Sequence, residues 1–301
     1  MYHTSSPLSG SFCPAEAHSG PKAMQRPSLS PRHVYTQPSG KPQDSNWDPQ
    51  KVKDARGKLP EAFRAPWSEL AMRRTCTCIY HFLVWSWYIF LNYYISQQGG
   101  DHRKSKIFLN GGQWKYLTFL NLLLQAIFYG VACMEDVLKR IKGERDIKFM
   151  SAFRDLLFTT LAFPISTFVF LSFWTLFLYD RELVYPKALD GIFPEWMNHA
   201  MHTTILPFSL VEVVLRPHCY PLRKKGLTLL AVASLAYISR VLWIYSETGT
   251  WVYPVFARLS PVGLTAFFSL SYIFSASIYI LGEKLNHWKW GDIMQPRKKR
   301  K

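Results

Sequence analysis

Long hydrophobic blocks follow one another through residues 75–282, with short charged segments between them. A helix needs about 20 mostly apolar residues to cross the hydrocarbon core of a bilayer. Six blocks reach or approach that length: Ile79–Ile95, Trp114–Met134, Leu156–Leu178, Trp196–Leu215, Gly226–Tyr245 and Val262–Gly282. The pattern predicts an all-α fold, a multi-pass membrane helix bundle of about six transmembrane helices.

The fourth block differs from the others because it contains polar side chains and a proline: Asn198, His199, His202, Pro207 and Glu212. A helix buried inside a bundle tolerates polar groups that a lipid-facing helix does not. Pro207 has no backbone N–H, so we expect a kink that opens space beside His202. Pro164 predicts a similar kink in the third block, and Glu212 is expected to pair with Arg216 one turn later.

The chain before the first block has a different composition. Residues 1–70 contain ten prolines and ten serines and almost no apolar runs, so they cannot bury enough surface to offset chain entropy. We therefore expect three regions: a disordered Pro/Ser-rich extension over 1–71, a six-span transmembrane domain over 72–290, and a basic cytosolic tail over 291–301.

The net charge of +16 lies around the hydrophobic blocks rather than on a polar domain, which argues against nucleic-acid binding. With six spans, the segments on one side of the membrane contain 19 Lys and Arg residues, and those on the other side contain 7. Because basic residues favour the cytosolic side, both termini are expected in the cytosol. A five-span arrangement without the fourth block would blur this asymmetry.

The sequence gives no indication of a metal site, a cofactor or a serine nucleophile. The five cysteines are scattered, which provides no disulfide framework. His199 and His202 share a helix face, but no second histidine cluster accompanies them, so we expect no metal. A G-x-S-x-G motif is also missing.

Three polar residues within the blocks are expected at similar depth in one leaflet. If both termini are cytosolic, the second and fourth blocks enter from the outer side, which places Thr118 roughly 6 Å and His202 roughly 9 Å deep. Arg240 lies one to two turns from the outer end of the fifth block. Each also has a structural interpretation. Thr118 can bond a carbonyl of its own helix, His202 can form a contact between helices, and the Arg240 side chain can reach the membrane surface.

Several motifs in the second half of the chain resemble a known family. The segments 198–207, 212–218, 248–254 and 281–290 read NHAMHTTILP, EVVLRPH, TGTWVYP and LGEKLNHWKW. Together with the ending QPRKKRK, they resemble the androgen-induced-gene family of multi-pass membrane proteins, and the likeness covers residues 72–301.

The resemblance implies a threonine hydrolase that cleaves fatty-acid esters of hydroxy fatty acids without a cofactor. The family's nucleophile maps onto Thr118, and its base, the second histidine of Asn-His-x-x-His, maps onto His202. We expect His202 to take the Thr118 proton as the hydroxyl attacks the ester carbonyl. Arg240 is our candidate partner for the substrate carboxylate and His199 the second candidate. Asn198 is a further candidate for substrate contact.

Two other functions stay open. One is a non-enzymatic membrane regulator of tissue factor pathway inhibitor at the endothelial surface, because one family member is named for an influence on that coagulation inhibitor. The other is a transporter or channel, although no internal repeat or matching pair of broken segments supports it. The resemblance implies the plasma membrane, including caveolae, or the endoplasmic reticulum, and the lysines near the end fit a retrieval signal to the latter.

Overall fold

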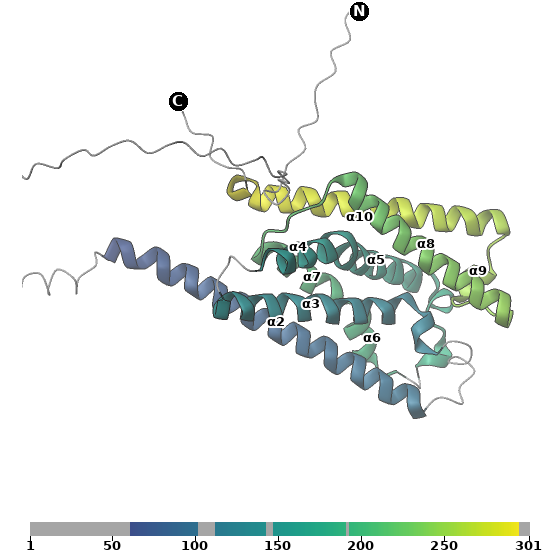
Figure 1. Cartoon of the computed structure of the whole chain (residues 1–301). Helices are drawn as coiled ribbons and strands as arrows, with labels where there is room; N and C mark the ends of the chain where they lie inside the picture. Colours follow the sequence, from purple (N-terminus) through teal and green to yellow (C-terminus); the bar gives the residue numbers. More distant parts are fainter. Residues whose placement is uncertain (1–60, 102–111, 143–146, 191–192, 295–301) are drawn as a thin grey trace, which may run out of the picture. The chain divides into compact units, whose positions relative to one another are not determined.

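The structure is a computed structural model that describes residues 61–101, 112–142, 147–190 and 193–294 (Figure 1). Within these ranges every regular element is helical and no strand occurs, which confirms the predicted all-α fold. The helices are α2 (Glu61–Asp101), α3 (Leu117–Lys142), α4 (Lys148–Leu157), α5 (Phe163–Asp180), α6 (Glu195–His202), α7 (Ile205–Leu215), α8 (Arg223–Thr248), α9 (Pro254–Ala257) and α10 (Pro261–Met294). A π-helical turn, η2 (Phe158–Ala162), joins α4 to α5, and the 3₁₀ turns are η1 (Gln113–Lys115), η3 (Arg181–Leu183) and η4 (Lys187–Leu189).

The described residues from Cys76 onward belong to one unit, and the described residues before them, 61–75, belong to another. Helix α2 begins at Glu61, so residues 61–71, which we expected in the disordered extension, are helical. Glu, Ala, Arg and Leu favour helix and make up most of that stretch. The rest of the predicted extension and most of the predicted basic tail lie outside the described residues.

Four described helical segments are long and apolar enough to cross a membrane: Leu117–Ile141, Lys148–Leu183, Arg223–Thr248 and Pro261–Gly291. They correspond to the second, third, fifth and sixth predicted blocks. The first block lies in α2, where aromatic and polar residues interrupt the aliphatic ones, and the fourth covers two short helices, α6 and α7. The chain is thus a multi-pass membrane protein. Length and composition support four of the six predicted spans.

The break between α6 and α7 follows from Pro207. A proline lacks the N–H that would bond the carbonyl four residues earlier, and its ring clashes with that carbonyl. Four residues before Pro207 is Thr203, and the helix is interrupted at Thr203 and Thr204. The Thr204 N–H bonds the His199 oxygen, five residues back, at 3.1 Å. The predicted kink is therefore confirmed as a break directly after His202.

Pro164 has a related effect at the start of α5. It deprives the Thr160 carbonyl of its α-helical donor, and Thr160 lies inside the π-helical turn η2. The Phe163 N–H bonds the Phe158 oxygen, five residues back rather than four. The predicted kink thus takes the form of a wide turn within a continuous helical segment.

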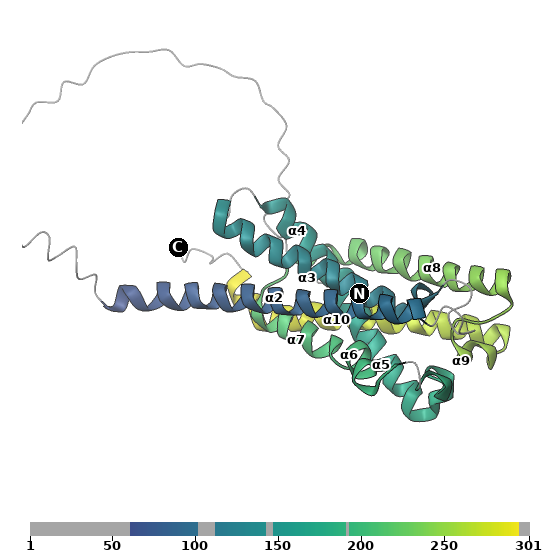
Figure 2. The ribbon, with the colours of Figure 1, turned by 90° about the horizontal axis from the view of Figure 1, so that it is seen from below.

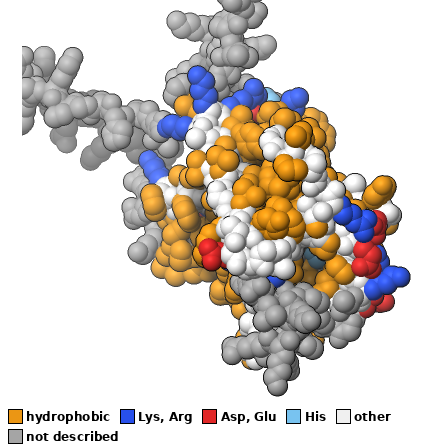
Figure 3. All heavy atoms as spheres, turned by 90° about the vertical axis from the view of Figure 1, so that its right-hand side faces the viewer, with side chains coloured by type: hydrophobic (Ala, Val, Ile, Leu, Met, Phe, Trp, Pro, Cys, Tyr) orange, Lys and Arg blue, Asp and Glu red, His pale blue; other side chains and the backbone are white. Residues whose placement is uncertain are grey.

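Helix α5 lies at the centre of the bundle, where it contacts α3, α6, α7 and α10. In the span that contains α4 and α5, 61% of the most apolar stretch is buried, against 17% in α8 and in α10. The latter two lie side by side (Figures 1 and 2). Both have exposed apolar side chains, among them Leu235 and Leu270. At the end that contains α9, hydrophobic side chains cover much of the face and charged ones gather near its margins (Figure 3).

A cluster of buried ionisable side chains joins four helices. His81 of α2 lies 2.6 Å from Asp136 of α3 and 2.8 Å from Glu212 of α7. The other Glu212 oxygen lies 3.2 Å from Nε2 of His218, whose Nδ1 is 3.0 Å from Asp155 of α4. Because both nitrogens of His81 face carboxylates, each can donate only if the ring is an imidazolium.

The expected pairing of Glu212 with Arg216 is wrong. Glu212 instead contacts the two histidines, and Arg216 contacts Asp136 at 2.7 Å and Glu135 at 3.3 Å. The helix ends at Leu215 and the backbone at Arg216 is extended, so Arg216 does not lie one helical turn above Glu212 as the prediction required.

Candidate active site

Thr118 and His202 meet across two helices. Thr118 is the second residue of α3, and His202 is the last residue of α6. Thr118 Oγ1 and His202 Nε2 are 3.1 Å apart, and the two residues are only 9% and 5% exposed. The two residues that the family resemblance singled out therefore lie within hydrogen-bond reach of each other, shielded from bulk water.

The other ring nitrogen of His202 determines which way this bond runs. Nδ1 lies 2.8 Å from the side-chain oxygen of Asn198 and 3.1 Å from its backbone oxygen. A carbonyl oxygen can only accept, so Nδ1 carries the proton of a neutral imidazole. Nε2 is then an acceptor, and the Thr118 hydroxyl donates to it. Asn198, our candidate for substrate contact, bonds the imidazole in this structure.

Phe173 of α5 supports the face of the imidazole. The ring centroids of Phe173 and His202 are 3.5 Å apart, and the ring planes differ by 5°. Asn198 holds one edge of the imidazole and Phe173 one face, so the side chain has little freedom to turn away from Thr118. The break after His202 also lets the chain change direction at this point.

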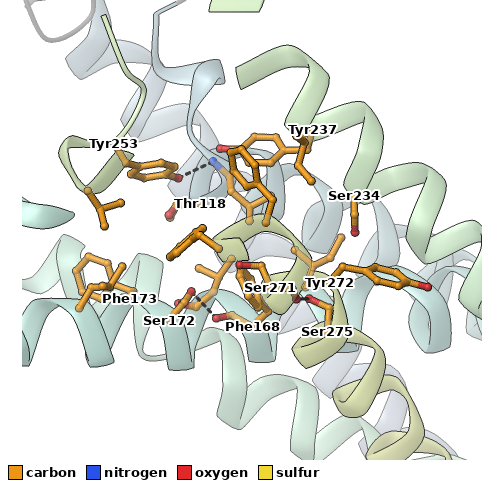
Figure 4. A pocket seen from close by; sticks show the side chains of 18 of the residues that line it. Thr118, Phe168, Ser172, Phe173, Ser234, Tyr237, Tyr253, Ser271, Tyr272 and Ser275 are labelled. Atoms are coloured by element: carbon orange, nitrogen blue, oxygen red, sulfur yellow. Dashed lines mark hydrogen bonds between the residues drawn. The ribbon is translucent and has the colours of Figure 1, made fainter. Parts of the chain in front are cut away.

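A large apolar cavity opens at Thr118 (Figure 4). It extends between α5, α8 and α10 and contains about 1050 Å³ of space free of atoms, including its open part. Its hydroxyl-bearing lining residues are Thr118, Ser172, Ser234, Tyr237, Tyr253, Ser271, Tyr272 and Ser275; the other lining residues are apolar.

A smaller cavity, with about 470 Å³ of space free of atoms including its open part, also has Thr118 in its lining. Its lining includes His202, Met201 and Phe193, and it shares Thr118 and Tyr253 with the larger cavity. Thr118 is thus placed at the junction of two largely apolar spaces, with His202 facing the smaller one.

The two candidates for carboxylate binding do not line either cavity. Arg240 donates to the Trp114 oxygen at 3.4 Å, beside the η1 turn that precedes Thr118. His199 is exposed, lies 3.0 Å from the Thr203 hydroxyl and stacks on Trp174. The structure therefore brings Thr118, His202 and Asn198 together and leaves Arg240 and His199 outside the cavities.

Tyr253 is a site residue that the sequence did not single out. Its hydroxyl oxygen accepts the Leu117 N–H at 3.0 Å, and its side chain lies beside Thr118 (Figure 4). Burial raises the pKa of Tyr253, so the hydroxyl keeps its proton and can donate. The motif TGTWVYP contains this residue, but the motif alone gave no reason to place it near Thr118.

Comparisons with known proteins agree with the sequence motifs. The family described as FAR-17a/AIG1-like protein matches residues 76–287. Human androgen-dependent TFPI-regulating protein is 74% identical over 230 residues, which cover 76% of this chain and 100% of the relative. Human androgen-induced gene 1 protein is 43% identical over 187 residues, 60% of this chain and 79% of the relative. No solved structure matches. The chain therefore belongs to the FAR-17a/AIG1-like family.

Proposed function

We propose that this chain hydrolyses lipid esters, with Thr118 as the nucleophile and His202 as the general base. The observation that carries the proposal is the 3.1 Å contact between Thr118 Oγ1 and His202 Nε2 at the junction of two cavities. A threonine hydroxyl is a weak nucleophile unless a base lies within hydrogen-bond reach. Apolar walls with few polar groups suit a lipid substrate better than a polar one.

The reaction is an acyl transfer in two stages. Thr118 Oγ1 attacks the ester carbonyl carbon while His202 Nε2 takes the hydroxyl proton. When the ester C–O bond breaks, His202 gives that proton to the departing alcohol oxygen. Water then attacks the acyl-threonine; His202 takes a proton from the water and passes it to Thr118 Oγ1 as the free acid leaves. We assign to the Tyr253 hydroxyl the role of donor to the carbonyl oxygen as negative charge develops there.

The substrate class that we propose is the fatty-acid ester of a hydroxy fatty acid, as the family resemblance implies. Such a molecule has one hydrocarbon chain on each side of a central ester. A nucleophile between two cavities matches that shape, whereas an ester with one long chain would fill only one of them. This mechanism uses no metal or cofactor.

The decisive experiment compares ester hydrolysis in membranes that contain the wild type, Thr118→Ala or His202→Ala at matched expression. Without either residue the nucleophile cannot be activated, and we expect the rate to fall by roughly two to four orders of magnitude. Thr265→Ala and His287→Ala are matched controls, since both residues are exposed on α10 and lie outside the two cavities. They should retain the wild-type rate.

Two results would refute the hydrolase. One is the absence of hydrolysis in wild-type membranes over control membranes, and the other is full activity in both site variants. Either would favour a second function, which rests on the 74% identity to a protein named for TFPI regulation. A regulator of tissue factor pathway inhibitor would change the amount of that inhibitor on endothelial cells even with Thr118→Ala.

We also propose that α2 and the pair α6–α7 cross the membrane with the other four helices, so that both termini are cytosolic. The asymmetry in Lys and Arg counts supports this arrangement. A glycosylation acceptor inserted after Lys187 should then be modified, and tags at both termini should be reached by antibody only in permeabilised cells. A terminal tag detected on intact cells would contradict it. In the same permeabilised cells, the position of the antibody label would distinguish the plasma membrane from the endoplasmic reticulum.

A further inference from the structure

The two cavities that meet at Thr118 differ in their relation to His202. Both are lined by Thr118, Phe173 and Tyr253, but His202 lines only the smaller one. In Figure 4 the larger cavity runs from Thr118 toward Ser234 of α8 and Ser275 of α10. An ester attacked by Thr118 must therefore place one half beside His202 and the other half in the space between α5, α8 and α10.

The chemistry of the first stage determines which half is which. His202 delivers a proton to the alcohol oxygen that leaves, so that oxygen has to lie on the imidazole side of the carbonyl carbon. The acyl group remains bonded to Thr118 Oγ1 and needs no contact with His202 until water arrives. The departing hydroxy acid therefore points into the smaller cavity, and the acyl chain points into the larger one.

Cations beside the smaller cavity favour the same orientation. Lys115 Nζ lies 5.4 Å from the centroid of the Tyr116 ring, and the Arg181 guanidinium carbon lies 5.6 Å from that of the Tyr185 ring. Both tyrosines line the smaller cavity. Arg181 is paired with Asp190, so the positive charge on this side comes mainly from Lys115. The hydroxy acid has a free carboxylate and the acyl chain has none, so this charge attracts the hydroxy-acid half.

The serines of the larger cavity do not make it a polar site. The Ser172 hydroxyl donates to the Phe168 oxygen at 2.6 Å, and that of Ser275 donates to the Ser271 oxygen at 2.9 Å. Because these hydroxyl protons bond the serines' own helices, the surface offered to a ligand is mostly apolar. That surface suits an unsubstituted hydrocarbon chain.

We infer that the larger cavity binds the acyl chain and the smaller cavity binds the hydroxy-acid half. The far end of the larger cavity, at Ser234 and Ser275, then limits the length of the acyl chain. This inference rests on the proposed hydrolase function and adds to it a rule for substrate selection: the two chains of the ester are selected by different residues.

The test measures kcat/KM for esters that vary one chain at a time. Ser234→Phe fills the far end of the larger cavity, so hydrolysis of a palmitoyl ester should fall roughly tenfold or more relative to a hexanoyl ester of the same hydroxy acid. The preference between long and short hydroxy acids should not change. Leu189→Trp, in the smaller cavity, should lower the rate for long hydroxy acids and leave the acyl preference as in the wild type.

Ser239→Phe is the matched control, because Ser239 lies on α8 with an exposed side chain; both preferences should equal those of the wild type. Ser275→Leu replaces Ser234→Phe if that variant does not fold. The inference is overturned if the variants exchange their effects, or if neither changes either preference. Failure of the hydrolase itself would be seen separately, as a wild type that cleaves none of the esters or a Thr118→Ala variant that cleaves them equally well.

Discussion

His202 is held at three points: Thr118 at Nε2, Asn198 at Nδ1 and Phe173 on its face. An imidazole with its proton fixed on Nδ1 keeps a lone pair at Nε2, which is what a base for Thr118 requires. In the proposed mechanism Asn198 therefore acts through His202 and is a positioning residue rather than a catalytic one.

Replacement of Asn198 should affect the rate more than binding. In Asn198→Ala we expect kcat to fall by roughly one to two orders of magnitude, less than the roughly 10⁴-fold loss when a histidine takes the wrong tautomer in a serine protease, because the Asn198 backbone oxygen still accepts from Nδ1. Separate determination of kcat and KM checks this. Asn198→Asp keeps an acceptor and should retain more activity; equal losses in both variants, or a loss confined to KM, would contradict the role.

At the same scale, the sequence supports some site residues better than others. The predicted depth in one leaflet and the family motifs both pointed to Thr118 and His202. Asn198 lies one helical turn before His202, so contact between these two side chains could be anticipated. Phe173 and Tyr253 could not, because they reach the site from distant segments. With 21 Phe and 16 Tyr in the chain, no single aromatic residue stands out before the helices are packed.

The helices themselves are interrupted where prolines remove donors, and the position of each interruption could be predicted. The presence of a proline did not determine the form of the interruption. Near Pro207 the chain divides into two helices, α6 and α7, whereas Pro164 follows a wide turn within a continuous helical segment. The wide turn before Pro164 packs against α3, α8 and α10. The contact between α2 and α7 through His81 and Glu212 could not be read from spacing, since it joins residues 131 apart.

Glu212 should be essential for the attachment of α7 to its neighbours. Glu212→Leu leaves His81 and His218 without the carboxylate between them, and the loss of one partner from a buried ion pair costs about 3–5 kcal/mol. We expect a clearly lower melting temperature in detergent and activity that falls with the folded fraction at constant KM.

Glu283→Gln is the comparison for that experiment. Glu283 pairs with Arg223 at 2.7 Å, but Arg223 is 59% exposed, and exposed pairs contribute at most about 1 kcal/mol. Its melting temperature should stay close to that of the wild type. If the two variants melt alike, the cluster around Glu212 is not a stabilising contact between helices.

For the molecule as a whole, hydropathy predicted the all-α class and the multi-pass membrane location, because long aliphatic blocks have few other uses. Hydropathy could not show which helices lie at the centre of the bundle and which lie at its periphery. α5 is central and α8 and α10 are peripheral although their blocks look alike in composition. The difference comes from contacts such as that of Gly282, where a Cβ atom would lie 2.8 Å from the Phe163 ring, so that α10 comes close to α5.

The π-helical turn between α4 and α5 has a consequence for the angular phase of this span. Successive residues of an α-helix advance by about 100°, so the one extra residue of the turn rotates α5 by that angle relative to a regular continuation of α4. Asp155 precedes the turn and faces the buried ion cluster, while Phe173 follows it and faces His202. Insertion or deletion of one residue within 158–162 would therefore turn one end of the span away from its partner.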